Sequence, residues 1–224
     1  MTGTLFGPGE KTDLCMFEEH AFRQGYKYIA GIDEAGRGAL AGPVVAAAVI
    51  FPRGIEIPGV NDSKKLTPSK REALYDSIIK NSLAVGVGVE DNLVIDEINI
   101  LQATLVSMKK AVQGLSIQPD FLLVDGNIAV PVNIPQKYII KGDSSSISVA
   151  AASIIAKVTR DRLMVEYDEI YPGYGFAGHK GYGCASHLAA IAELSPCVLH
   201  RKTFRGVKEH VRGNPTELDR GSML

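Results

Sequence analysis

Four acidic residues follow short apolar segments of this 224-residue chain. Asp33 and Glu34 end YIAGIDE, Asp125 ends FLLVD, and Asp143 follows KYIIKG. Short apolar runs of this kind, bounded by small or turn-forming residues, are typical of buried strands. The four acids can therefore converge at one edge of a single sheet.

Acids that meet without a basic residue among them repel one another, and a divalent cation relieves that repulsion. Oxygen ligands suit Mg²⁺ or Mn²⁺. A pair of such ions held by carboxylates is suited to in-line displacement at a phosphodiester. Chemistry of this kind needs neither a nucleophilic side chain nor a catalytic histidine.

The rest of the hydrophobic pattern alternates between strands and helices. Thr67 and Pro68 form a helix start, with Thr67 as the N-cap. An α/β fold follows: a mixed sheet flanked by helices, with a helical C-terminal portion. We expect strands at about 27–33, 42–51, 83–90, 121–125 and 137–143, and helices at about 16–25, 68–80, 98–115, 146–170 and 186–194.

A glycine-rich turn follows the first two acids. Adjacent strand residues point to opposite faces, so Asp33 and Glu34 serve one site only if the chain bends after them. Gly36, Arg37 and Gly38 allow this bend. The glycines also expose amide groups to a phosphate or a sugar hydroxyl, and Arg37 can contact a phosphate or an acid. A plain tight turn is the alternative.

The other two acids have ordinary alternatives as well. Asp125 and Gly126 can form a strand-end turn, and Asp143 can be the N-cap of the helix that begins near Ser146.

The net charge of −1 implies that any affinity for nucleic acid is local. Two basic clusters are candidates, although each can equally be a solvated face. The first contains Lys64, Lys65, Lys70 and Arg71, and the second contains Arg201, Lys202, Arg205, Lys208 and Arg212.

The chain reads as one domain over residues 27–212, with an N-terminal extension at 1–26 and a flexible tail at 213–224. Its three cysteines have no disulfide-framework spacing. The sequence shows neither a signal peptide nor a run of about 18 apolar residues. We therefore expect a cytoplasmic monomer that makes no membrane contact.

Several ordered motifs resemble bacterial ribonuclease HII, the type 2 ribonuclease H group, over about residues 27–208. They are YIAGIDEAGRGALAGPVVAAAVI, NDSKKL, FLLVDG, KGDSSSISVAAASIIAKVTRD, YPGYGFAGHKGYG and PCVLHRKTF. The resemblance implies a ribonuclease H-like fold. It also implies a metal-dependent endonuclease that cuts the RNA strand of RNA·DNA hybrids.

The same resemblance implies cleavage 5′ of ribonucleotides embedded in duplex DNA, as in ribonucleotide excision repair, leaving 5′-phosphate and 3′-hydroxyl ends. Its two-metal site for Mg²⁺ or Mn²⁺ falls on Asp33, Glu34, Asp125 and Asp143. Its sensor of the 2′-hydroxyl falls on Gly36, Arg37 and Gly38. The resemblance also implies that Tyr182 would stack on the sugar 3′ of the ribonucleotide and that Lys64 would contact a phosphate. Cys184 stands where members of the family commonly have Thr.

Two other interpretations are open. Cys184 with His187, and Cys197 with His200, form two C-x-x-H units that can close a zinc site. The acids can instead belong to a metal-dependent phosphatase or to a non-catalytic nucleic-acid binder. His179 is either a group beside the metals or an ordinary structural histidine.

Overall fold

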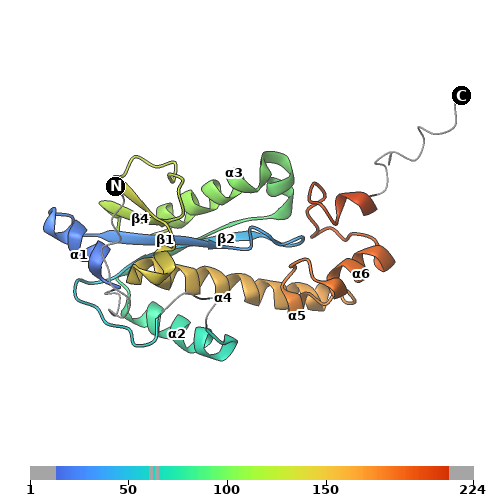
Figure 1. Ribbon diagram of the computed structural model, residues 1–224, viewed down its shortest axis with the longest axis horizontal. Coiled ribbons are helices and arrows are strands. Elements are labelled where there is room, and N and C mark those ends of the chain that lie inside the picture. The colour runs from blue at the N-terminus through green and yellow to red at the C-terminus, as the bar shows by residue number, and fades with distance from the viewer. Residues whose placement is uncertain (1–13, 61–62, 64–65, 212–224) are drawn as a thin grey trace, which may run out of the picture.

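The structure, a computed structural model, describes residues 14–60, 63 and 66–211. Its centre is a five-stranded sheet in the order β3-β2-β1-β4-β5 (Figure 1). β1 pairs antiparallel with β2, and β2 with β3, whereas β1–β4 and β4–β5 are parallel. The predicted mixed sheet is confirmed. The strands are β1 (Ile29–Ala35), β2 (Val44–Ile50), β3 (Ala84–Glu90), β4 (Phe121–Asp125) and β5 (Gln136–Ile139).

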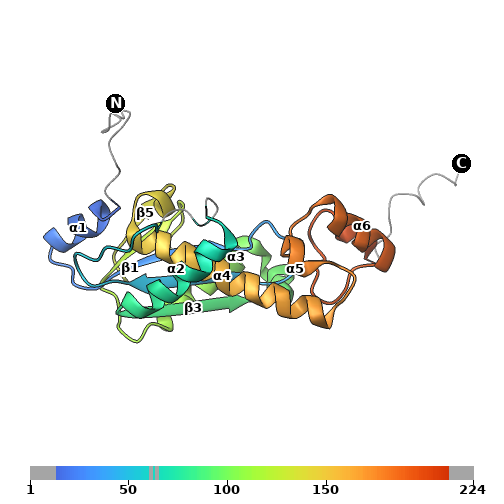
Figure 2. The ribbon, with the colours of Figure 1, turned by 90° about the horizontal axis from the view of Figure 1, so that it is seen from below.

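Helices cover both faces of the sheet. In Figure 1, α3 lies on one side and α4 with α2 on the other, while α5 and α6 form the predicted helical C-terminal portion at one end. Figure 2 shows α2 running beside α4. No helix in the described ranges is both long enough and apolar enough to span a bilayer. The helices are α1 (Met16–Arg23), α2 (Pro68–Asn81), α3 (Asn92–Gln113), α4 (Ile147–Ile170), α5 (Phe176–His179) and α6 (Ala185–Leu194), with 3₁₀ turns η2 (Gly142–Ser144) and η3 (Lys208–His210).

The composition of β2, VVAAAVI, explains its central place. All seven residues are buried. Ala47 packs in the cluster formed with α4 and α2, while Ala46 and Ala48 pack in the cluster formed with α3. Small side chains on both faces let the helices approach closely. Gly31 of β1 serves the same purpose, because a Cβ there would lie 2.1 Å from the Ser148 carbonyl carbon of α4.

Two helix starts show how local capping decides boundaries. α2 begins as predicted, with Pro68 in its first turn and the Thr67 hydroxyl accepting the Lys70 N–H at 3.3 Å. α3 begins at Asn92, six residues before the predicted position. It is interrupted at Asn99, where φ is 70° and the side chain accepts N–H groups of the following turn. The amphipathic sequence pattern predicted only the part of α3 after this break. The part before the break begins at its own N-cap, Asp91, whose side chain accepts the Val94 amide.

The N-terminal helix is fastened to the start of α4. The buried Glu18 accepts hydrogen bonds at Oε1 from the Ser146 hydroxyl at 2.6 Å, the Ser148 hydroxyl at 2.5 Å and the Ser148 amide at 3.0 Å. A carboxylate is favourable here because the N-terminus of a helix carries partial positive charge. α1 therefore supports the α4 end that follows Asp143.

Glu18→Ala should lower the free energy of unfolding by about 2–3 kcal/mol, because it leaves buried donors without their charged acceptor. Urea unfolding followed by circular dichroism measures this loss. The neighbouring Glu19 is the control, since it pairs with the exposed Arg53. Glu19→Ala should leave the free energy of unfolding close to that of the wild type, because exposed ion pairs contribute little to stability. Equal losses in the two variants would contradict the buried role of Glu18.

Candidate active site

The segments that carry the four acids meet at the carboxyl end of the parallel strands. Ile32 of β1 lies opposite Val124 of β4, so the next residues, Asp33 and Asp125, are neighbours at that edge. Asp143 lies in η2, shortly after β5, and the preceding amide of Gly142 donates to Asp125 Oδ1 at 2.7 Å. The edge where loops diverge from parallel strands is the usual place for a reactive site.

The chain does not bend between the first two acids. β1 continues to Ala35, with Glu34 opposite Ala46, so the predicted strand end at residue 33 was two residues too early. The bend comes at Gly36, where φ is 95°. Both acids nevertheless face one region, because the Ser153 side chain hydrogen-bonds Asp33 and lines a cavity together with Glu34.

Negative charge accumulates around Asp33. Burial raises the pKa of this carboxyl well above its ordinary value, and the charges of Glu34 and Asp125 raise it further. The hydrogen bonds from Ser153 and from the Glu34 amide, the latter at 2.7 Å, act in the opposite direction. A divalent cation would balance this charge, and the all-oxygen donor set fits a hard ion such as Mg²⁺ or Mn²⁺.

The carboxylates are engaged with protein donors in this conformation. Asp125 accepts the Gly142 amide, and Glu34 pairs with Arg37 at 3.1 Å. Across residues 14–60, 63 and 66–211, no three His, Cys, Asp or Glu side chains are placed to hold one ion together. The donor chemistry therefore fits a cation, while the side chains lie in a different arrangement from that of a closed metal site.

The structure also decides the local alternatives for the later acids. α4 is capped by Ser146, whose hydroxyl accepts the Val149 amide at 3.2 Å, and not by Asp143. Gly126 does form a turn after Asp125, with φ of 100°. That turn does not occupy the Asp125 side chain, which points to the η2 segment instead.

Residues 36–38 are called here the glycine turn, and the Arg201 side chain hydrogen-bonds to their backbone. This side chain is fully buried and donates to the carbonyls of Gly36 at 2.7 Å and Arg37 at 2.8 Å. The prediction that Arg201 belongs to a basic surface for phosphate was wrong. A cluster of basic residues in the sequence does not show which side chains are exposed, and the fold buries Arg201.

The two glycines of the turn have different surroundings. At Gly36 a Cβ would lie 2.0 Å from Arg160 Nε and 2.8 Å from the Pro43 carbonyl oxygen, and φ is positive. At Gly38 a Cβ would meet no atom of the described protein within 4 Å, and φ is not in the left-handed region. The protein's own packing thus explains Gly36 but not Gly38.

Tyr182 lies beside the glycine turn. An isolated β-bridge joins it to Ala39, and its ring is partly exposed, with Lys157 Nζ at 5.5 Å and Arg160 Cζ at 5.3 Å from the ring centroid. A cavity of about 420 Å³ brings these features together. It is lined by Glu34, Ala35, Gly36, Arg37, Gly38, Ser63, Ser153, Lys157 and Tyr182.

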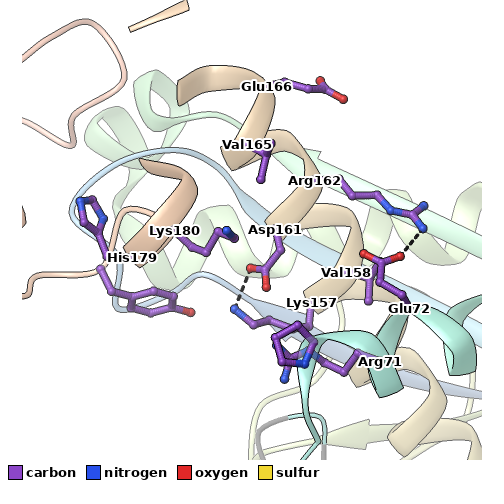
Figure 3. Close-up of a pocket in the computed structure, with 13 residues that line it drawn as sticks. Arg71, Glu72, Lys157, Val158, Asp161, Arg162, Val165, Glu166, His179 and Lys180 are labelled. Carbon is purple, nitrogen blue, oxygen red and sulfur yellow. Dashed lines mark hydrogen bonds and ion pairs between the residues drawn. The ribbon is translucent and has the colours of Figure 1, made fainter. Parts of the chain in front are cut away.

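A second cavity, of about 650 Å³, adjoins the first and shares Lys157 and Tyr182 with it. Its charges are largely paired. Lys157 contacts Asp161 at 2.7 Å, and Arg162 contacts Glu72 at 2.5 Å (Figure 3). The first cavity contains one of the four acids, Glu34, and is therefore the candidate reactive site.

Of the first predicted basic cluster, Lys64 and Lys65 lie outside the described residues. Arg71 does not project to solvent as a free cation. It donates to the carbonyls of Ser63 at 2.9 Å and Leu66 at 2.6 Å. Arg71 thus joins α2 to the backbone at Ser63 and Leu66.

The alternative zinc module does not form among the described residues. Cys184 is exposed and contacts the Ser186 hydroxyl, while His187 and His200 are buried and contact each other. His179 is structural, because Nδ1 accepts the Gly181 amide at 3.1 Å and Nε2 donates to the Tyr174 carbonyl at 2.8 Å.

Sequence reasoning assigned no role to Ser63, Ser153, Lys157 or Arg160. Arg160 had the clearest signal, since it lies four residues from each of the apolar Ala156 and Met164 on one helix face. All three are buried. An arginine on an apolar helix face must find buried acceptors, and Arg160 finds the carbonyls of residues 41, 43 and 180.

Comparisons with known proteins identify the family and the fold. The family model for ribonuclease HII matches residues 30–207. The ribonuclease HII of Geotalea uraniireducens (strain Rf4) is 67% identical over 211 residues, which cover 94% of this chain and 98% of that protein. The ribonuclease H2 of Pyrococcus horikoshii OT3 superposes with a TM-score of 0.68 at 27% identity, covering 81% of this chain and 96% of that one.

A ribonuclease HIII, Bst-RNase HIII, solved in complex with Mn²⁺, shares the fold at 21% identity, with a TM-score of 0.61 and coverage of 82% of this chain and 69% of that one.

The mixed sheet between helices, together with the match to ribonuclease H2, places the chain in the class of ribonuclease H-like nucleases. Such enzymes hydrolyse phosphodiesters. The chain belongs to the ribonuclease HII family. It is therefore a ribonuclease H, an endonuclease acting on RNA in hybrids, and neither a phosphatase nor a non-catalytic binder.

Proposed function

We propose that this ribonuclease also cuts duplex DNA on the 5′ side of a single embedded ribonucleotide, leaving 5′-phosphate and 3′-hydroxyl ends. The observation that carries the proposal is the cavity that Glu34 shares with the glycine turn and Tyr182. Chemistry and sugar recognition would then occur at one place. This is the activity expected of an enzyme of ribonucleotide excision repair.

Asp33, Glu34, Asp125 and Asp143 are the proposed ligands of two divalent cations, Mg²⁺ or Mn²⁺. Such cations supply the positive charge that activates water and stabilises the leaving oxygen. The raised pKa of Asp33 supports this assignment, because burial, and then the charges of Glu34 and Asp125, disfavour an anion there unless a cation is bound. The Mn²⁺ complex of the ribonuclease HIII neighbour supports the class of ion.

The proposed sensor of the ribose is the glycine turn. Arg201 already occupies the carbonyls of Gly36 and Arg37, so we assign contact with the 2′-hydroxyl to amide groups of the turn. The 2′-hydroxyl is the group that distinguishes RNA from DNA at a given sugar. The open space at Gly38 allows a sugar to approach the backbone closely.

Tyr182 is proposed to stack on the sugar 3′ of the ribonucleotide, which favours a junction between RNA and DNA. Lys64 is proposed to contact a phosphate, and its neighbour Ser63 lines the cavity. All of these residues belong to one chain, so the proposal requires only a monomer. It retains residues 27–212 as the catalytic domain, with the extension 1–26 and the tail 213–224.

The test uses three labelled substrates: a DNA duplex with one ribonucleotide, the same duplex without it, and a continuous RNA·DNA hybrid. We expect cleavage of the first and third in Mg²⁺ or Mn²⁺, and none after chelation. A ligation or phosphatase assay on the products identifies the two new ends. Cleavage of the hybrid alone would overturn the proposal and leave the general ribonuclease H activity intact.

A further inference from the structure

We propose that residues 197–201, called here the bridge segment, position the glycine turn and Tyr182 relative to each other and thereby set the selectivity for a ribose. His200 and Arg201 are positioning residues in this proposal, because they act through the groups expected to touch the sugar. The inference deepens the proposed function and depends on it for the identity of the substrate.

Arg201 contacts the glycine turn, the proposed sensor of the ribose. Its guanidinium is fully buried and donates to four carbonyls on both sides of the loop between β1 and β2. The bonds go to Gly36 at 2.7 Å, Arg37 at 2.8 Å, Gly42 at 3.0 and 3.1 Å, and Pro43 at 3.2 Å. A planar fork of five N–H donors suits this set of acceptors, whereas a lysine ammonium would satisfy fewer of them. Arg201 therefore fixes the backbone of the glycine turn against the strand ends.

His200 is connected to the backbone of Tyr182 through His187. The Cys197 amide donates to His200 Nδ1 at 3.0 Å, so the His200 proton is on Nε2. Nε2 then donates to His187 Nε2 at 3.1 Å, and His187 Nδ1 donates to the Tyr182 carbonyl at 3.0 Å. This chain of donors and acceptors requires both rings to be neutral.

The surroundings keep them neutral. Both imidazoles are fully buried. Burial, and then the neighbouring His187, lower the pKa of His200 to about 4, and burial also lowers the pKa of His187. The direction of each hydrogen bond in the chain is therefore fixed at pH 7, and Tyr182 has a fixed backbone support.

The geometry makes the bridge segment the shared support of both recognition groups. Two consecutive residues reach the glycine turn and Tyr182, and a further β-bridge joins His200 to Ala41 within the intervening loop. A shift of about 1 Å in the position of a reacting or orienting group can cost about 10²-fold in rate. A change in the bridge segment should therefore affect the selectivity for the sugar more than it affects the positions of the four acidic side chains.

Arg201→Lys tests the inference, with Met108→Ala as a control of general destabilisation. Met108 is buried in the cluster on the α3 face of the sheet, away from the glycine turn. The assay compares cleavage of DNA duplexes that carry one ribonucleotide or its 2′-fluoro analogue. Both kcat and KM are measured below the melting temperature of each variant.

We expect Arg201→Lys to lower kcat/KM for the ribonucleotide duplex by about 10²-fold and to reduce its preference over the fluoro analogue by about tenfold. Met108→Ala should leave that preference unchanged. An unchanged preference in Arg201→Lys would overturn the inference. If Arg201→Lys does not fold, His200→Phe is decisive, since it removes the donor to His187 while keeping a ring in place.

The wild-type enzyme separates the two proposals in the same experiment. Failure of the wild type to cut the single-ribonucleotide duplex would overturn the proposed function. In that case the preference is measured on RNA·DNA hybrids with 2′-hydroxyl or 2′-fluoro sugars at the cleaved step. An unchanged preference there would overturn the role of the bridge segment by itself.

Discussion

Asp33→Asn is expected to abolish cleavage while making the metal-free protein more stable. The carboxyl of Asp33 is buried, and burial raises its pKa. The charges of Glu34 and Asp125 raise that pKa further. An amide removes a charge that this environment disfavours. It keeps an oxygen that can accept the Glu34 amide, which now donates to Asp33 at 2.7 Å. Function and stability should therefore change in opposite directions.

The expected loss of kcat is about 10³-fold or more, since residues that act together at one catalytic centre are not replaced by their neighbours. The melting temperature without metal should rise by about 2–4 °C for each kcal/mol of relieved repulsion. Single-turnover cleavage and thermal melting in chelator measure the two effects. Near-wild-type cleavage would remove Asp33 from the proposed metal site.

Asp76→Asn is the matched control for this change. Asp76 lies on the exposed face of α2, so its replacement alters net charge by the same amount without touching the sheet edge. Cleavage and melting should both stay close to the wild type. A rise in melting temperature equal to that of Asp33→Asn would mean that net charge, and not the acid cluster, is responsible.

The second large expected effect is a difference between alanine substitutions at the two glycines of the turn. Gly36→Ala should lower the free energy of unfolding by about 3 kcal/mol or more, because overpacking and a positive φ act together. Its new Cβ would lie 2.0 Å from Arg160 Nε, at a φ of 95°. Gly38→Ala should change stability by less than about 1 kcal/mol, since its Cβ enters open space.

Gly38→Ala should nevertheless lower kcat/KM on the single-ribonucleotide duplex by at least about tenfold, because the methyl group occupies space proposed for the sugar. Gly38→Val should lower it further. Urea unfolding and steady-state cleavage of both alanine variants give the comparison. If activity falls only in proportion to stability in both, residues 36–38 are a plain tight turn without a role in recognition.

The sequence alone was sufficient to place the acids and most of the elements. Strand-like runs that end in Asp33, Asp125 and Asp143 are local patterns, and so is the helix start at Thr67 and Pro68. Such features depend on periodicity, capping and turn chemistry over a few residues. The mixed sheet and the meeting of the acid-bearing segments at its edge could be predicted for that reason.

The structure was needed wherever a side chain finds its partner far along the chain. Arg201 lies 165 residues from Gly36, whose carbonyl it binds, and Glu18 lies 128 residues from Ser146. No local pattern reveals such a pairing, because burial of a charge depends on which carbonyls or hydroxyls the fold brings to it.

The same physical reason limits what could be learned about the glycine turn. Two glycines two positions apart look equivalent in sequence, yet Gly36 is packed against Arg160, whereas a Cβ at Gly38 would meet no described atom within 4 Å. The sequence by itself predicted that the segments carrying the four acids and the glycine turn meet at one edge of the sheet. Only the tertiary structure decided which glycine serves the fold, which faces the cavity, and how buried arginine and histidine side chains hold them there, since these depend on contacts between distant segments.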